Sequence, residues 1–436
     1  MEGCHNGMNA VIIVLDFIPI YDTHRLVLNH EKKDSQDLTY LVFTSLAHFA
    51  NDGNFLLYSL LIVYYHTALN LNEAFVGIGA IASNLLSGIL TGPISLYAQR
   101  SGRTGTMIAL GIFLEGISAL MFSLPFFISG LSYWFIFVSA GVLGLGQAFY
   151  HPLGASLINQ TYGSRKGPGY LGINGSLGSI GRAIFPLIIG TAVLFFSYGG
   201  GILTTGILML ALSLVIYNGL GGSSTKTNPV KTDESHGSTG KPDMKPYAFF
   251  VYFFTASMFL RSVFYLGVNT YLADYLQMFT NSKFVTSIIL TIAFIPPIIG
   301  QPIFGKMVTE RGGRLIVILT GYMSVVGFAL FMISANVLLL TATLGFFAFF
   351  AFTGFPVMLG YIGQKIPRDI LPFTNAIVWG VGNTLGSSAG VGIMVVLLTY
   401  WNLSFSFWVM LLIGFISVLM LQFEPKRNRE MAEITS

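Results

Sequence analysis

The chain has 436 residues, of which 53% are hydrophobic and only 9% are charged. A soluble domain carries roughly 25% charged residues, so the composition excludes a soluble protein and predicts a polytopic membrane protein. The net charge of +4 is small, which argues against nucleic-acid binding, and the one cysteine, Cys4, excludes an internal disulfide and a cysteine-built metal site.

Residues 1–37 contain one short apolar run, which Asp16 and Pro19 interrupt and which is too short to span a bilayer. Glu2 and no basic residue precede it, so a signal peptide is not expected. We interpret this segment as an N-terminal cytoplasmic tail without an assigned function. A start at Met8 or at a later codon is the alternative.

The first predicted spanning helix, residues 38–66, carries two ionisable side chains in its middle. His48 and Asp52 are four residues apart and therefore share one face of the helix. An ionisable pair at that depth is costly unless it faces a polar cavity or a partner inside the bundle. The pattern therefore indicates part of a substrate or proton pathway.

Apolar segments of spanning length alternate with short polar breaks from residue 38 onward and predict an all-α membrane protein. The long break at 220–245 is rich in Gly, Ser, Thr and Lys and too polar to pack a core. We therefore expect six-helix halves at 38–219 and 246–423, joined by a cytoplasmic linker and followed by a tail at 424–436. The twelve predicted helices are 38–66, 72–98, 104–125, 132–161, 168–196, 200–219, 246–275, 282–307, 314–334, 336–363, 370–398 and 402–423.

The basic residues in the breaks lie almost entirely on one predicted side of the membrane, and Lys283 is the exception. By the positive-inside rule, this distribution predicts that both termini and the linker lie in the cytoplasm. We expect a multi-pass protein of the plasma membrane. The residues on the predicted cytoplasmic side are Arg100, Arg103, Arg165, Lys166, Lys226, Lys231, Lys241, Lys245, Lys306, Arg311, Arg314, Lys365, Arg368, Lys426, Arg427 and Arg429.

The two predicted halves repeat short motifs at similar spacings. QRSGR after the second helix matches ERGGR after the eighth, and YHPLG in the fourth matches GFPVMLG in the tenth. GSLGSIG in the fifth helix likewise matches GVGNTLG in the eleventh. Two six-helix halves related by a parallel repeat, with a central site between them, are typical of major facilitator transporters.

Four segments carry a closer resemblance: HFANDGNFLLYSLLIVYY, GLGQAFYHPLGASL, GYLGINGSLGSIGRAIFPLIIG and FLRSVFYLGVNTYLADYLQ. Over nearly all of residues 38–423 the chain resembles the major facilitator superfamily, and within it the fosmidomycin-resistance type of drug efflux transporter. The resemblance implies alternating access and a cavity lined by the first, fourth, seventh and tenth helices.

The family's cytoplasmic loop motif, G-x-x-x-D-R-x-G-R, stands here as SLYAQRSGR, with Ser95 and Gln99 at its glycine and aspartate positions. Through the resemblance, this loop and its repeat are expected to latch the halves in one conformational state and release them in the other. Simple positive-inside anchoring is the alternative reading of the arginines. The residues expected to act in gating are Arg100, Gly102, Arg103, Glu310, Arg311 and Arg314.

The fifth predicted helix resembles the antiporter motif G-x8-G-x3-G-P-x2-G-G. Gly172, Gly181, Pro186 and Gly190 match, whereas other residues replace two of the glycines. Small residues let helices approach and proline bends them, so Gly181 and Pro186 are expected to form a hinge, with ordinary packing as the alternative. A third motif has Ala140 in place of its arginine, so no proton-transfer role is carried over from it.

Three ionisable side chains are the candidates for proton coupling. Burial is expected to raise the pKa of Asp52, whereas a nearby arginine is expected to lower it. Substrate binding at that arginine would therefore make Asp52 release or take up a proton. His48 and His151 would share the proton or donate to substrate. A permanent strut between Asp52 and an arginine is the alternative, and His151 would alternatively satisfy backbone groups freed by Pro152.

Arg261 and Arg182 are the candidate anion-binding residues, because a guanidinium can grip a carboxylate or phosphonate with two hydrogen bonds. Arg182 is the one for which a purely structural role is the stronger alternative. We favour a structural role for Glu115 on a peripheral helix, and core packing over a cavity wall for Phe352 and Phe355. Further polar groups at cavity depth are Gln147, Tyr265, Asn383 and, more weakly, Asn269.

The sequence contains no G-x4-G-K-S/T loop, so ATP is not the expected energy source. We expect a secondary transporter rather than an enzyme. It is expected to couple protons to the export of a small anionic or amphiphilic compound, and to need no cofactor or metal. Proton-coupled uptake of an organic anion is the alternative, and a non-transporting membrane sensor is a more distant one. The expected partners are a small-molecule substrate, protons and the lipid bilayer, and the chain is expected to be a monomer.

Overall fold

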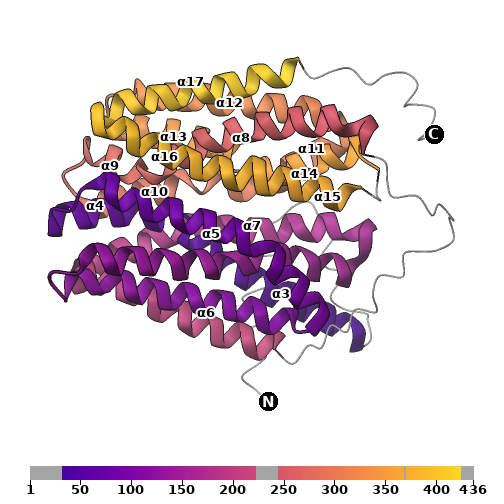
Figure 1. Cartoon of the computed structure of the whole chain (residues 1–436), viewed down its shortest axis with the longest axis horizontal. Helices are drawn as coiled ribbons and strands as arrows, with labels where there is room; N and C mark the ends of the chain where they lie inside the picture. Colours follow the sequence, from indigo (N-terminus) through magenta and orange to yellow (C-terminus); the bar gives the residue numbers. More distant parts are fainter. Residues whose placement is uncertain (1–31, 222–243, 368–369, 424–436) are drawn as a thin grey trace.

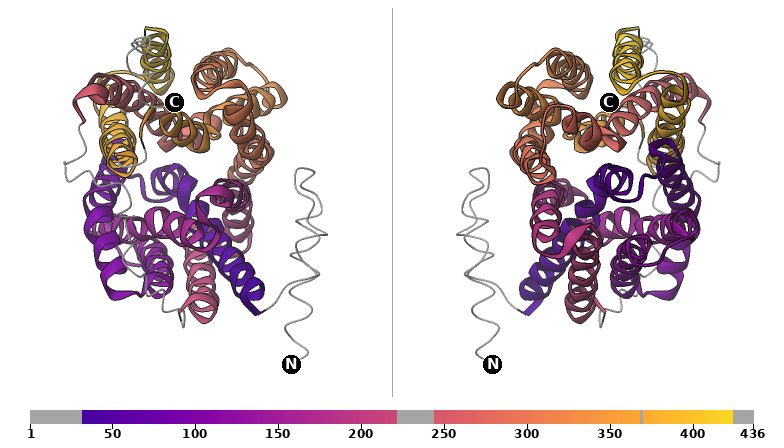
Figure 2. Two further views of the ribbon diagram at one scale, coloured as in Figure 1. Left: turned by 90° about the vertical axis from the view of Figure 1, so that its right-hand side faces the viewer. Right: turned by 90° about the vertical axis from the view of Figure 1, so that its left-hand side faces the viewer.

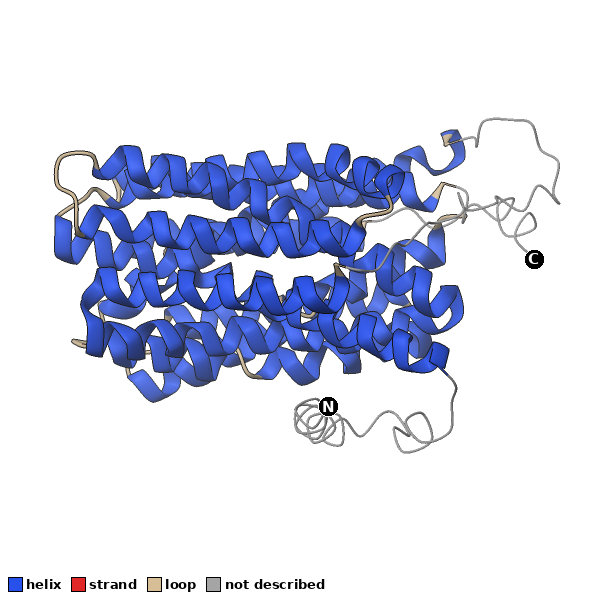
Figure 3. Ribbon diagram, turned by 90° about the horizontal axis from the view of Figure 1, so that it is seen from below, coloured by secondary structure: helices blue, strands red, loops and turns tan. Residues whose placement is uncertain are grey.

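The computed structural model describes residues 32–221, 244–367 and 370–423, and each regular element in these ranges is a helix. Figure 3 shows the helices running side by side along one common direction. The all-α membrane fold predicted from hydropathy is confirmed. Most of the predicted N-terminal tail, nearly all of the linker and the C-terminal tail lie outside the described residues.

The first part of the chain forms one long bundle. The first predicted helix is interrupted by a 3-10 turn directly after Gly53, so that the segment with His48 and Asp52 is separate from the segment that follows. The elements are α3 (Lys32–Gly53), η1 (Asn54–Leu56), α4 (Leu57–Leu69), α5 (Glu73–Ser101), α6 (Thr104–Ser123), η2 (Leu124–Phe126) and α7 (Ser132–Leu220).

Helix α7 covers three of the predicted helices. As one straight rod its 89 residues would extend about 130 Å, several times the thickness of a bilayer. Instead the chain runs back and forth, as the purple-to-magenta ribbon in Figure 1 shows. Ser197, with a φ of 69°, marks an interruption close to the predicted break at 196–200.

The second part of the chain is divided more finely than predicted. Pro296 and Pro297 lie at the boundary of two helices, because proline has no backbone N–H for the preceding turn. The elements are η3 (Lys245–Tyr247), α8 (Ala248–Thr270), α9 (Leu272–Gln277), α10 (Lys283–Ala293), α11 (Pro296–Arg311), α12 (Gly313–Met332), α13 (Val337–Ala351), α14 (Gly354–Lys365), α15 (Leu371–Ile377), the π-helical η4 (Val378–Leu385), α16 (Gly386–Tyr400) and α17 (Leu403–Gln422).

Nine helical stretches in the described ranges are long and apolar enough to cross a membrane. One of them, Gly169–Leu220, has 52 residues, which is enough for more than one crossing. Large apolar side chains such as Phe195 and Leu338 are 75% and 82% exposed, as expected for a surface that lipid solvates. The count of twelve helices stays a prediction.

The helices form two groups that face each other. Figure 1 shows α3–α7 in one group and α8–α17 in the other, and the end-on views in Figure 2 show the same division. One apolar core crosses the division, with Leu61 and Tyr65 of the first group and Phe264 and Leu272 of the second. In Figure 1, α4 and α9 lie at the end of the bundle opposite to the start of α3, and we call it the α4–α9 end.

Candidate functional site

A cavity of about 280 Å³ lies between the two helix groups. Its lining includes all eight side chains that the sequence suggested for proton coupling or substrate binding. The first group contributes His48, Asp52, Gln147, His151 and Arg182, and the second contributes Arg261, Tyr265 and Asn383.

Asp52 is the centre of a polar cluster on the first group's side of the cavity. Its Oδ2 lies 2.9 Å from Arg182 Nη2 and 3.2 Å from His48 Nε2. Its Oδ1 accepts a hydrogen bond from Asn51 Nδ2 at 3.0 Å and lies 3.7 Å from His151 Nε2. Both carboxylate oxygens are therefore occupied, and the carboxylate side chain is only 8% exposed.

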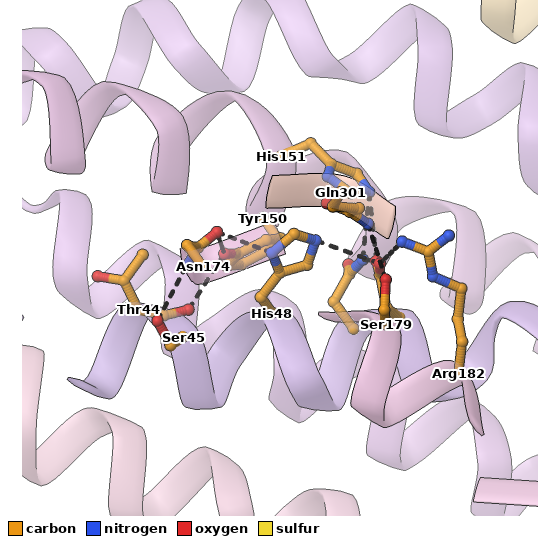
Figure 4. Close-up of polar contacts among 11 residues, drawn as sticks. Thr44, Ser45, His48, Tyr150, His151, Asn174, Ser179, Arg182 and Gln301 are labelled. Carbon is orange, nitrogen blue, oxygen red and sulfur yellow. Dashed lines mark hydrogen bonds and ion pairs between the residues drawn. The ribbon is translucent and has the colours of Figure 1, made fainter. Parts of the chain in front are cut away.

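His48 connects Asp52 to a second set of polar groups. Its Nδ1 lies 2.7 Å from Asn174 Oδ1, which also accepts a hydrogen bond from the Tyr150 hydroxyl at 3.0 Å (Figure 4). Asn174 Nδ2 in turn donates to Ser45 Oγ at 3.3 Å. Both ring nitrogens of His48 therefore face side-chain oxygens, and the ring bridges Asp52 and Asn174.

Two glycines of α7 allow this cluster to form. A Cβ at Gly178 would lie 2.5 Å from His48 Cδ2 and 2.7 Å from Asp52 Oδ2, and a Cβ at Gly181 would overlap the carbonyl oxygen of Phe49. Only glycine permits such an approach of two helices. Arg182, the residue after Gly181, is thereby brought within contact distance of Asp52.

Arg261 lies on the opposite side of the cavity and is placed differently from Arg182. Its Nη2 donates to the carbonyl oxygen of Ala351 at 2.9 Å, and its Cζ lies 4.5 Å from the centre of the Tyr265 ring. No carboxylate in the described ranges pairs with it. Gly354 makes room for the guanidinium, because a Cβ there would overlap it.

The side chain of His151 is more exposed than those of His48, Asp52 and Arg182, with an exposed fraction of 34%. Asn51 Nδ2 lies 3.3 Å from its Nε2, and the ring centre is 5.8 Å from that of Trp379 across the cavity. Its ring contacts thus run to side chains of the cavity. Gln147, one turn earlier, accepts a hydrogen bond from Ser83 Oγ at 3.5 Å.

The ligand atoms of His48, Asp52 and His151 all lie within 4.8 Å of one another, which is a spacing that a metal ion could draw together. The guanidinium of Arg182 already occupies Asp52 Oδ2 and would repel a metal cation at that oxygen. The arrangement therefore fits an ion-pair network better than a metal centre.

Glu115 lies away from the cavity and is completely buried. Its Oε2 accepts a hydrogen bond from Asn54 Nδ2 at 2.7 Å, which ties α6 to the 3-10 turn after Asp52. Asn269 is also buried, donates to the backbone carbonyl of Tyr265 at 2.6 Å, and is not among the residues that line the cavity. Phe352 does line it, and the side chain of Phe355 lies outside the described parts of the structure.

The predicted gating residues lie at the ends of helices. Gly102, with a φ of 66°, ends α5, where glycine is favoured. Glu310 pairs with Lys306 at 3.6 Å within α11, and Arg314 Nη2 donates to the carbonyl oxygen of Gln422 at 3.0 Å. Pro186, which was expected to form a hinge with Gly181, lies instead in the interior of α7 and is buried. The exposed charged positions are Arg100, Arg103, Glu310, Arg311 and Arg314.

Several residues of the site were not singled out from the sequence. Gln301 of α11 crosses between the groups and donates to Ser179 Oγ at 2.7 Å, and Ser176 Oγ donates to the carbonyl oxygen of Ile298 at 3.0 Å (Figure 4 shows the first pair). Asn51 could have been found, because it lies three residues after His48 on nearly the same face. The others had no local signal: Asn174, Gly178, Gln301 and Trp379.

Comparisons with known proteins agree with this architecture. A family model described as Major Facilitator Superfamily matches residues 44–279 and, in a second match, residues 247–433. A crystal structure of a mutant of the peptide transporter POT in complex with alafosfalin has a similar fold, with a TM-score of 0.64 and 14% sequence identity. That match covers 92% of this chain and 100% of the other, and at such identity it concerns the fold alone. No curated protein matches the sequence.

Proposed function

Because this chain belongs to the major facilitator superfamily, we propose that it is a secondary transporter that couples protons to the export of a small anionic or amphiphilic compound. The family is one of multi-pass membrane transporters, whereas the coupling ion, direction and substrate are the proposal. The observation that carries it is the contrast between the two cavity arginines: Arg182 is paired with Asp52, and Arg261 is not paired with a carboxylate.

The charge of the cavity supports an anionic group on the substrate. Among the described lining residues, Asp52 is the one carboxylate against the two guanidinium groups. An unpaired guanidinium in a low-dielectric cavity is costly, so a carboxylate or phosphonate at Arg261 would be stabilised by charge-assisted hydrogen bonds. Phe352 and Trp379 add an aromatic wall for an apolar portion of the substrate.

Export by exchange follows if the substrate and the proton compete for binding at Asp52. A compound with its anionic group at Arg261 and a hydrogen-bond donor directed at Asp52 would displace a proton from Asp52. Binding would then require release of the proton, so that the two move in opposite directions. The partial antiporter motif, with Gly181 packed against α3, and the resemblance to fosmidomycin-resistance transporters support this direction.

The Arg182–Asp52 pair favours a second candidate, proton-coupled uptake. An anion that takes Arg182 from Asp52 leaves the buried carboxylate without its counter-charge, which favours proton binding at Asp52. The anion and the proton would then bind together and move in the same direction. The two candidates therefore predict opposite signs for the proton change on substrate binding.

Flux in proteoliposomes with an imposed pH gradient separates these candidates, whichever way the protein is inserted. Export by exchange predicts that an acidic interior drives a phosphonate such as fosmidomycin into the vesicles, and cotransport predicts that an acidic exterior does so. Flux that ignores the gradient would refute proton coupling. Binding without flux under either gradient would instead support a sensor.

The proposed membrane orientation has both termini in the cytoplasm of a plasma-membrane protein. The basic residues in the breaks on the side of α3 and α15 support it, since such residues are retained on the cytoplasmic side. Under this orientation the α4–α9 end faces the outside of the cell. The protein is proposed to act as a monomer, because both halves of the cavity come from one chain.

A further inference from the structure

Arg261 holds the end of a helix in the second group. Ala351 is the last residue of α13, and Phe352 and Thr353 separate α13 from α14. The last carbonyl groups of an α-helix have no partner within the helix itself. Here the carbonyl oxygen of Ala351 accepts a hydrogen bond from Arg261 Nη2 at 2.9 Å. Arg261 therefore caps the C-terminal end of α13.

Phe352, the residue directly after this capped end, contacts Arg182 of the first group. The centre of its ring lies 5.8 Å from Arg182 Cζ, a distance at which the face of an aromatic ring attracts a guanidinium. Phe55 of the first group places a second ring 5.6 Å from the same atom. The centres of the two rings are 5.3 Å apart. The guanidinium that pairs with Asp52 is thus held by one ring from each helix group.

Aromatic rings also connect Phe352 back to Arg261. The centre of the Tyr265 ring is 6.1 Å from that of Phe352 and 4.5 Å from Arg261 Cζ. Aromatic pairs attract each other at such separations. A path of direct contacts therefore joins the two sides of the cavity, and its members in order are Arg261, Tyr265, Phe352, Arg182 and Asp52.

The guanidinium of Arg182 is free to respond to a change along this path. Its Nη2 pairs with Asp52, whereas its Nε is buried and has no hydrogen-bond partner among the described residues. The pair therefore lacks the two parallel hydrogen bonds of a bidentate arginine–carboxylate contact. A displacement of a ring that covers Arg182 can consequently shift the guanidinium relative to Asp52.

We propose that Phe352 couples substrate binding at Arg261 to the Arg182–Asp52 pair. An anion at Arg261 competes with the carbonyl oxygen of Ala351, because it offers oxygen acceptors and opposite charge at once. It draws Arg261 from the end of α13 and releases Phe352, so that the ring moves off Arg182. Phe352 is thus a positioning residue that acts through Arg182.

This role rests on the proposed function, because it requires an anion at Arg261 and a proton at Asp52. It gives the substrate an effect on Asp52 without a direct contact. Once the ring of Phe352 has left, Arg182 keeps Asp52 and Phe55 as partners, and closer pairing with the carboxylate favours release of its proton. The sign is therefore the one that exchange of substrate for proton requires.

The number of protons released per bound anion measures this coupling. Hexanoate suits the test, because an ionised carboxylate only accepts hydrogen bonds and cannot donate one directly to Asp52. It is titrated into the purified protein by calorimetry in two buffers with different ionisation enthalpies, at saturating concentrations. Phe352→Leu removes the ring from Arg182, and its proton number should fall to near zero. Phe352→Tyr keeps the ring and should keep the release of protons.

Phe294→Leu is the matched control. The Phe294 ring packs on those of Phe55 and Phe352, with 6.3 and 5.0 Å between the ring centres, and it is buried more deeply than Phe352. In the described ranges the rings over Arg182 are those of Phe55 and Phe352. Phe294→Leu should therefore lower the unfolding temperature but keep the proton number. An unchanged proton number in Phe352→Leu, an equal loss in both variants, or proton uptake by the wild type would overturn the assigned role.

A double-mutant cycle tests the path without a proton measurement. Asp52→Asn should change the dissociation constant of hexanoate in the wild-type background, because the two sites are connected. The same substitution should have little effect in the Phe352→Leu background, where the path is interrupted. Equal effects of Asp52→Asn in both backgrounds would show that Phe352 does not connect the sites.

The results also separate this role from the proposed function. If the wild type and Phe352→Leu release equal numbers of protons, the role of Phe352 alone is wrong. If the wild type moves no proton but the cycle shows coupling between Asp52 and Phe352, proton coupling is wrong and the path stands. If hexanoate does not bind, or if its binding neither moves protons nor responds to Asp52→Asn, both proposals are wrong.

Discussion

Arg182 Nη2 lies 2.9 Å from Asp52 Oδ2, so the carboxylate on α3 and the guanidinium on α7 form a direct, almost fully buried ion pair beside the central cavity. His48, one turn before Asp52, contacts the same oxygen at 3.2 Å. One carboxylate oxygen is thus shared by a permanent cation and by a ring that can gain or lose a proton. Any change at one of these partners must alter the other two.

Asp52→Asn should abolish the proton change that accompanies substrate binding. The amide cannot take up or release a proton, although it keeps the shape of the side chain. The test is to add fosmidomycin or another phosphonate to the purified protein in weakly buffered detergent and to record the pH. An unchanged proton signal and unchanged substrate affinity in this variant would make Asp52 a strut.

Asp52→Asn should also lower the unfolding temperature, because it leaves Arg182 as an unpaired buried charge. Breaking a buried pair in this way costs up to about 3–5 kcal/mol. Asp52→Asn combined with Arg182→Gln removes both charges and should recover much of that stability. If the pair is only structural, the double variant regains proton-coupled flux as well, whereas a proton carrier predicts stability without coupling.

Gly181→Ala should separate α3 from α7 and break the Asp52–Arg182 pair, because the new methyl group would overlap the carbonyl oxygen of Phe49. Overpacking of this kind costs about 1–3 kcal/mol. Gly172→Ala is the matched control, since no atom lies within 4 Å of its added Cβ and it belongs to the same motif. Thermal unfolding and flux should fall in the first variant and stay near wild type in the second.

Arg261→Gln should weaken the binding of an anionic substrate. Charge-assisted hydrogen bonds contribute about 1.5–3 kcal/mol, which corresponds to a rise of roughly 10- to 150-fold in the dissociation constant. Arg261→Lys keeps the charge but loses the planar fork, so an intermediate affinity is expected. Isothermal titration calorimetry of a phosphonate checks this series, and equal affinities in all three proteins would remove Arg261 from the site.

Glu115→Ala should destabilise the protein without changing its proton coupling. The substitution leaves Asn54 Nδ2 without its partner in a buried position, at a cost of about 1–3 kcal/mol. Glu115→Gln retains an oxygen acceptor and should cost less. A lost proton signal in Glu115→Gln, at wild-type stability, would contradict the structural role assigned to Glu115.

The class of the fold could be predicted because a helix that spans the bilayer needs a long segment of mostly apolar residues, and the sequence shows such segments directly. The subdivision of the helices could not be predicted as well. The π-helical stretch η4, with Trp379 and Asn383, packs against α8 and α5 and lies inside the predicted helix 370–398, where no change of helix type was predicted. The break between α3 and α4 after Gly53 likewise occurs without a proline that would have predicted it.

The alignment of His48 with Asp52 follows from helical spacing alone, and the structure has them in contact. Which arginine would reach Asp52 was not predictable in that way, because it depends on the close approach of α7 to α3 at Gly178 and Gly181. Asn174, which fixes the far side of His48, is one amide among many polar residues of the membrane helices. Its role arises from tertiary packing, and no periodicity marks it.

The hydrogen bonds from Gln301 to Ser179, from Ser176 to Ile298 and from Ala273 to Ser59 join the two helix groups through uncharged atoms. Each such bond contributes about 0.5–1.5 kcal/mol net, so breaking all three requires only a few kcal/mol. A ligand held at micromolar affinity supplies about 8 kcal/mol of binding free energy, and part of it is enough for this work. These polar contacts are therefore weak enough to exchange when a substrate binds, whereas the apolar core shared by Leu61, Tyr65, Phe264 and Leu272 carries the larger part of the attraction between the two groups.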